Sequence, residues 1–156
     1  MLAALLRDFW VWTELPEDRW GTTDLRAISV DSVEYPGIGG LCDECIRKIN
    51  GDLSDEEMNM FLMGMAIDSE AEAILDACIR EGTDEFLCRV VKAGIGFPQV
   101  DTRWQLAEIL RREVPDRDKL LGLLSADPHP YVRKRAENVK EYLLWDANWQ
   151  PGMELK

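Results

Sequence analysis

Two cysteines separated by two residues, in the segment LCDECIRKIN (residues 41–50), are the feature of this chain that most directly suggests redox or metal chemistry. A reactive thiol needs a lowered pKa, whereas the carboxylates of Asp43 and Glu44, which lie between Cys42 and Cys45, act to raise it. On a helix the two cysteines share an apolar face with Ile46, and a buried cysteine packs as a small hydrophobic residue. We therefore expect structural cysteines, and a Cys-x-x-Cys metal or redox protein is our third hypothesis for function.

The other residues with ligand or nucleophile chemistry do not complete a site. Cys78 and Cys88 are ten residues apart rather than in a second Cys-x-x-Cys pair, which a four-ligand zinc site would favour. His129 is the only histidine, so a cluster of histidine metal ligands within one chain is excluded, and its place between Pro128 and Pro130 indicates an exposed turn residue rather than a catalytic base. Phosphate-binding glycine motifs and calcium-loop motifs are absent from the sequence. We predict no catalytic residue, no metal ligand and no cofactor, and hence a protein that is not an enzyme.

Acidic residues are concentrated in the first two-thirds of the chain. The sequence has 30 acids and 18 bases, and residues 1–100 hold 20 of the acids but only eight of the bases. One stretch carries eight acids and no lysine or arginine: Asp52, Asp55, Glu56, Glu57, Asp68, Glu70, Glu72 and Asp76. Such a field repels nucleic acid and attracts basic proteins, although acidity that only maintains solubility is the simpler alternative.

Methionines accompany these acids in the segment MNMFLMGM (58–65). Met60 and Met63 fall in line with Glu56 at helical spacing, on a different face from the inward Met58 and Met65. Flexible thioethers beside carboxylates suit a surface that adapts to a partner, unless another helix covers them. The predicted partner-binding residues are Asp52, Asp55, Glu56, Met60, Met63, Asp68, Glu70 and Glu72.

Apolar residues at helical spacing predict the elements that hold these side chains. Capping boxes, Ser54 with Glu57 and Ser69 with Glu72, predict the starts of two helices. Further apolar stripes predict helices over 2–12, 83–94, 101–114, 116–127 and 130–144. The stretch 13–38 fits either a strand or a helix, and we expect an irregular tail from residue 145 onward.

The last four of these helices form two similar units. The segments PQVDTRWQLAEI (98–109) and PHPYVRKRAENV (128–139) align at an offset of 30, which pairs Arg103 with Arg133, and the preceding helices align at an offset of 33. Each unit is a helix, a turn, a proline and a second helix with an arginine. This pattern resembles the HEAT-type repeat, in which Asp127 and Arg133 match the turn acid and the second-helix arginine.

The resemblance implies an all-α fold: a short right-handed stack of antiparallel helix pairs, HEAT/armadillo-like, with a less regular N-terminal third. The first unit departs from the family pattern, because Phe97 stands where the acid would be. A helix pair cannot bury its apolar face alone, so neighbours must stack. We expect one domain, 1–156, made of a capping region (1–50), a degenerate helix pair (54–81), two clear repeats (83–113 and 116–144) and a tail (145–156).

Fold style and charge together suggest a binding protein. Small acidic helical proteins of this kind resemble bacterial immunity proteins, which neutralise a basic toxin, often a nuclease. The resemblance implies a non-catalytic domain that docks its carboxylates over the cationic site of a basic partner. The alternative is a helical-repeat scaffold or adaptor with no inhibitory role.

The same sequence features indicate where the protein acts and what it does not bind. The N-terminus reaches Arg7 and Asp8 too early for a signal peptide, and no run of about 18 apolar residues occurs. We expect a cytoplasmic protein that binds neither membrane nor nucleic acid. The basic strip Arg133, Lys134, Arg135 and Lys140 fits a solvated helix face better than a nucleic-acid site.

Overall fold

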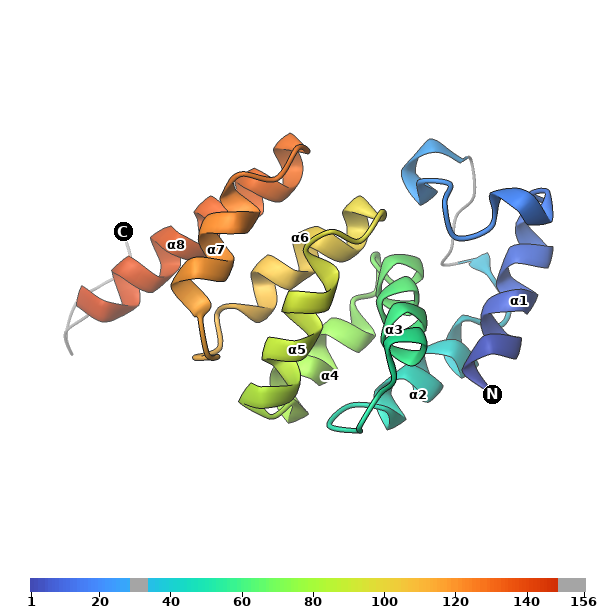
Figure 1. The fold of residues 1–156 in the computed structure, drawn as a ribbon, viewed down its shortest axis with the longest axis horizontal. Coiled ribbons are helices and arrows are strands. Elements are labelled where there is room, and N and C mark those ends of the chain that lie inside the picture. Colours follow the sequence, from blue (N-terminus) through green and yellow to red (C-terminus); the bar gives the residue numbers. More distant parts are fainter. Residues whose placement is uncertain (29–33, 149–156) are drawn as a thin grey trace.

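A computed structural model describes residues 1–28 and 34–148, and within them the secondary structure consists of helices and turns, with no strand (Figure 1). This confirms the predicted all-α class. The elements are α1 (Leu2–Thr13), the 3-10 turns η1 (Glu17–Arg19) and η2 (Leu25–Ala27), α2 (Ile38–Arg47), α3 (Asp55–Ile67), α4 (Ala73–Glu81), α5 (Asp84–Gly94), α6 (Val100–Ile109), α7 (Arg117–Ser125) and α8 (Pro130–Asn148). Of the undecided stretch 13–38, residues 29–33 lie outside the described residues.

Consecutive helices pack in pairs, and the pairs follow one another from α1 at one end of the molecule to α8 at the other (Figure 1). Within the pairs, α1 contacts α2, α3 contacts α4, α5 contacts α6 and α7 contacts α8. Between pairs, α2, α4, α6 and α8 contact in that order, as do α1, α3 and α5. The predicted capping region therefore contributes a helix pair of its own, α1 with α2.

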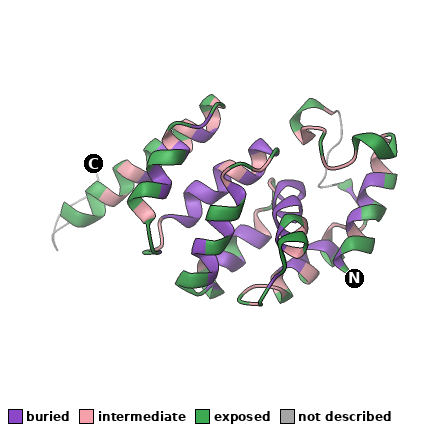
Figure 2. Cartoon of the chain, viewed as in Figure 1, coloured by how far each residue is buried: buried purple, intermediate pink, exposed green. Residues whose placement is uncertain are grey.

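The helices at the centre are buried on almost every side (Figure 2). Every residue of α3 from Phe61 to Ile67 is buried, and α6 is buried from Trp104 to Ile109. A helix contacted on several sides needs apolar or internally bonded residues all round, rather than a single stripe. In α6 two buried polar side chains are hydrogen-bonded to the backbone of α3: Thr102 Oγ1 donates to the carbonyl of Leu62 at 2.8 Å, and Gln105 Nε2 donates to that of Met65 at 2.8 Å.

One predicted capping box is confirmed and the other is wrong. Ser54 Oγ accepts from the Glu57 amide at 3.1 Å, while Glu57 Oε2 accepts from the Ser54 amide at 2.9 Å. The helix predicted from residue 69 begins only at Ala73, because Glu72 adopts a left-handed conformation (φ 58°). Asp68 takes over the role of the cap: its Oδ2 accepts from the Ile74 amide at 2.8 Å.

The repeat in the sequence has equivalent contacts in the structure. Arg103 Nη1 donates to the carbonyl of Phe97 at 2.8 Å, and Arg133 Nη1, thirty residues later, donates to that of Asp127 at 2.7 Å. Asp127 also pairs with the arginine of the preceding unit, since Arg103 Nε lies 2.8 Å from its Oδ2. The side chains of this pair are 12% and 4% exposed, so the ion pair joins the two units inside the molecule.

Two predicted helix ends differ from the observed ones. The sixth helix ends at Ile109 rather than just before Pro115. The last helix continues through residues 145–148, which we expected in an irregular tail; Pro151 is the first helix breaker in that part of the sequence. The rest of the tail, 149–156, lies outside the described residues.

Candidate functional site

An open groove of about 620 Å³ lies between α1, α3 and the segment that joins α5 to α6. We call it the methionine groove and define it by six lining residues: Leu6, Trp10, Glu56, Met60, Met63 and Phe97. It brings together three of the eight predicted partner-binding residues, Glu56, Met60 and Met63. Their spacing of four and three residues places them on one face of α3, as the sequence predicted.

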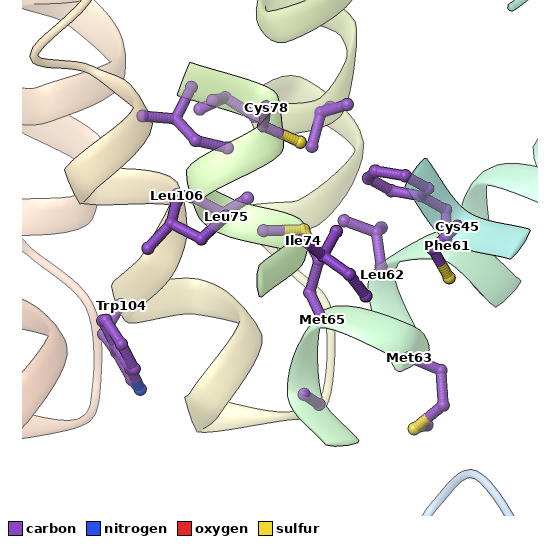
Figure 3. Packing of buried hydrophobic residues seen from close by; sticks show 14 of the residues in the cluster. Cys45, Phe61, Leu62, Met63, Met65, Ile74, Leu75, Cys78, Trp104 and Leu106 are labelled. Carbon is purple, nitrogen blue, oxygen red and sulfur yellow. The ribbon is translucent and has the colours of Figure 1, made fainter. Parts of the chain in front are cut away.

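The opposite face of α3 packs in the core, and this packing sets which side chains of the helix face the groove. Phe61, Leu62 and Met65 are fully buried in the core, and Figure 3 shows Met63 pointing away from that cluster. Met63 is only 5% exposed because α3 is covered on this side as well, whereas Met60 is half-buried. Another part of the chain therefore covers the methionines in part and leaves the groove open above them.

Helix α1 supplies the opposite wall of the groove. Leu6 and Trp10 lie one turn apart on its buried face, and the ring of Trp10 packs edge-on against Phe9 at 5.1 Å between centroids. This packing fixes the indole beside the groove. Of the three residues that sequence reasoning did not assign to the site, only Trp10 carried a signal: five of the six tryptophans lie near the two ends of the sequence, where caps or interface anchors are expected. Leu6 and Phe97 carried none.

One carboxylate, that of Glu56, lines the groove near the N-terminal end of α3. The exposed Asp52 and Asp55 precede Glu56 in the chain by four residues and by one residue, and we call these three acids the acidic rim. No lysine or arginine is found among the described residues that line the groove. The site therefore combines an apolar floor with a negative edge.

The other predicted acids lie elsewhere, so residues 52–76 do not present one negative face. Helix α3 separates the acidic rim from Asp68, Glu70 and Glu72, and its 13 residues span about 20 Å. Glu70 is exposed beside a polar pocket of about 230 Å³ that also contacts Arg26. Glu72 is half-buried, and desolvation raises its pKa despite the nearby Arg135.

Asp68 does not belong to a binding surface, because it is 2% exposed and caps α4. Burial raises the pKa of its carboxyl group above the ordinary 3.8, although the hydrogen bond from the Ile74 amide acts in the opposite direction. Its second oxygen, Oδ1, has no hydrogen-bond partner among the described residues. The prediction that Asp68 contacts a partner is therefore corrected: the residue acts inside the fold.

The Cys-x-x-Cys pair lies in the core. All four cysteines are buried and free, and α2 places Cys45 against Gly64 of α3. Burial, followed by the nearby carboxylate of Asp68, raises the pKa of Cys42 far above its usual range, and raises that of Cys45 to about 12. Thiols with such pKa values stay protonated, whereas the thiolate is the nucleophile and the metal ligand. Within residues 1–28 and 34–148, no three cysteine, histidine or acidic side chains are grouped as metal ligands.

Arginine side chains and aromatic rings pack against one another between α6 and α8. The Arg135 guanidinium lies 4.2 Å from the ring centre of Trp104 and donates to Glu108 Oε1 at 2.7 Å. Arg26 stacks on Tyr131 at 4.8 Å. Trp104 is 5% exposed and fills the space between α6 and α8. Two of the four bases in the predicted strip, Arg133 and Arg135, are thus held by internal contacts.

Comparison with known proteins adds no relative: no protein-family model, no curated protein and no solved structure matches the chain significantly. None of the helices in the described ranges is both long enough and apolar enough to cross a membrane.

Proposed function

We propose that this chain is a helical-repeat domain, HEAT-like in its stacking, that binds a basic protein through the methionine groove and the acidic rim. One observation carries the proposal: an open apolar groove whose only charged lining residue in the described chain is a glutamate. The equivalent contacts of Arg103 and Arg133 support a repeat architecture. Repeat folds typically offer extended surfaces to protein partners, which favours a binding function.

The groove and the rim have different roles in this proposal. The net charge of −12 steers a basic partner toward the acidic part of the chain and raises the association rate. The groove then accepts an apolar side chain of the partner, and the adaptable thioethers of Met60 and Met63 fit around it beside the fixed indole of Trp10. Charge therefore accounts mainly for the association rate, and the groove for the residence time.

A phage-displayed library of random peptides tests the binding mode without a known partner. We expect the selected peptides to combine lysine or arginine with one large apolar residue, and their association rates to fall as salt is added. Glu56→Lys and Met60→Lys should each weaken the selected peptides at least about tenfold. Glu141→Lys is the matched control, since this exposed acid lies on α8 at the other end of the molecule. Selection of acidic peptides, or equal weakening by Glu141→Lys, would refute the proposed site.

The more specific form of the proposal is toxin neutralisation, as in an immunity protein. It is tested by expressing the product of the adjacent reading frame with and without this chain and following bacterial growth. Growth arrest that this chain relieves, and that the Met60→Lys variant relieves poorly, supports immunity. A neighbouring product that is harmless, or a toxic one that this chain leaves active, excludes it and favours the scaffold or adaptor function through the same groove.

A further inference from the structure

The last helix extends well beyond its neighbour. Helix α8 has 19 residues, whereas α7, against which it packs, has nine. Its C-terminal turns run past the end of α7 at the edge of the molecule (Figure 1). From residue 140 to residue 148, the end of the described chain, no side chain is buried. Leu143 packs against the core and the Arg111 guanidinium lies 4.4 Å from the ring centre of Tyr142, but the segment has less cover than the other helices, and tertiary packing supplies most of a helix's stability in water.

Large apolar side chains occupy this uncovered segment. Tyr142 and Trp145 are each 41% exposed and Leu144 is 65% exposed. Beside them, α7 and α8 form a second groove of about 350 Å³, which we call the α7–α8 groove. Its apolar residues are Leu121, Leu143 and Leu144, and its charged residues are Arg117, Asp118 and Lys140. Such an exposed apolar surface with a polar border is typical of a protein–protein interface.

We propose that the α7–α8 groove and the exposed end of α8 bind a second copy of this chain in a two-fold dimer. Charge is the reason for choosing a second copy. Residues 101–156 carry ten acids and ten bases, so this half adds no net like charge where two copies meet, whereas residues 1–100 carry 12 more acids than bases and would repel each other. A basic partner, in contrast, is attracted to the acidic part of the chain.

The border of the groove is also suited to a two-fold contact. In such an interface each copy presents the same surface to the other, so a usable surface must be complementary to itself. The α7–α8 groove has this property because Arg117 and Lys140 stand around it together with Asp118. The Asp118 carboxylate of one copy can therefore face Arg117 or Lys140 of the other, around apolar contacts between the Leu144 and Trp145 side chains.

Sedimentation velocity of the full chain, from about 1 μM to about 200 μM, tests the proposal. We expect a reversible monomer–dimer equilibrium, and Leu144→Glu should raise the dissociation constant at least about tenfold. Val11→Glu is the matched control: Val11 is 58% exposed, but it lies on α1 at the opposite end of the molecule. Neither substitution removes a buried side chain, so circular dichroism should show both variants folded.

A second pair of variants distinguishes a specific contact in the groove from nonspecific association. Lys140→Glu changes a charge in the groove, whereas Lys134→Glu makes the same change on the exposed part of α8 outside it. The first should weaken the dimer and the second should leave it nearly unchanged. A chain that stays monomeric over the whole concentration range would overturn the proposal and indicate another occupant of this surface. Equal effects of Leu144→Glu and Val11→Glu would overturn it as well.

Discussion

The buried ion pair between Arg103 and Asp127 is the contact whose loss should affect the stack most. Asp127 accepts from Arg103 Nε at 2.8 Å, from Arg103 Nη2 at 3.2 Å and from the His129 amide at 2.8 Å. Replacement by alanine removes all three bonds and leaves a guanidinium group whose side chain is 12% exposed. Loss of one partner of a buried pair typically costs about 3–5 kcal/mol. We therefore expect Asp127→Ala to lower the free energy of unfolding by about that amount, a large part of the roughly 5–15 kcal/mol of a typical domain.

A double-mutant cycle isolates the pair from the other effects of these substitutions. Arg103→Met leaves the Asp127 carboxylate buried without its cation, and the double variant leaves neither charge. The double variant should therefore lose less stability than the two single variants added together, by about 1–3 kcal/mol. Urea unfolding followed by tryptophan fluorescence gives each free energy by linear extrapolation.

An exposed ion pair of the same length provides the control. Lys92 Nζ also lies 2.8 Å from a carboxylate oxygen, that of Asp116, but these side chains are 52% and 53% exposed. Water replaces the lost contact there, so Lys92→Met should produce no resolvable change in stability. If Asp127→Ala behaves like Lys92→Met, or if the cycle is additive, the Arg103–Asp127 pair does not join the two units energetically.

Three further predictions test the core. Gly64→Ala should destabilise the protein by about 1–3 kcal/mol, because the added Cβ would meet Cys45 Sγ at 2.5 Å. The control is Gly122→Ala on the exposed face of α7, where a Cβ meets no described atom within 4 Å and should stabilise the helix by about 0.5–1 kcal/mol. If urea unfolding gives both substitutions the same sign, the packing of α2 on α3 is contradicted. The raised pKa of Asp68 means that, above pH 3.8, the folded chain binds more protons than the unfolded chain, so stability falls as pH rises from there through the folded pKa. Asp68→Asn should become progressively more stable relative to the parent protein over that range, and a difference independent of pH would show that the carboxyl group is not desolvated. The four buried thiols should react with a thiol reagent only after unfolding in urea, and rapid reaction of any of them in native protein would revive the redox hypothesis.

Local sequence patterns determined most of the secondary structure. Apolar residues at helical spacing predicted α1, α3, α5 and α7 to within one or two residues. The Ser54–Glu57 capping box fixed the start of α3, and the offset of 30 correctly matched the contacts of Arg103 and Arg133. These features depend on neighbours within one or two turns, so they can be read from the chain without knowing how the helices pack.

The composition of the site was decided by tertiary structure. The line of Glu56, Met60 and Met63 was visible in the sequence, but the wall opposite comes from Leu6 and Trp10, which precede it by about fifty residues. The predicted acidic face divided because α3 separates its two ends in space.

Asp68 shows the same limit at a single residue. In the sequence it is one of eight acids in a stretch without lysine or arginine, and its neighbours give no sign of burial. It caps α4 inside the molecule because the left-handed Glu72 delays that helix until Ala73, and because the Cys42 thiol on α2 and the residues around it exclude water. Burial depends on which helices meet, and that is set by packing among segments far apart in the chain rather than by the residues beside a carboxylate.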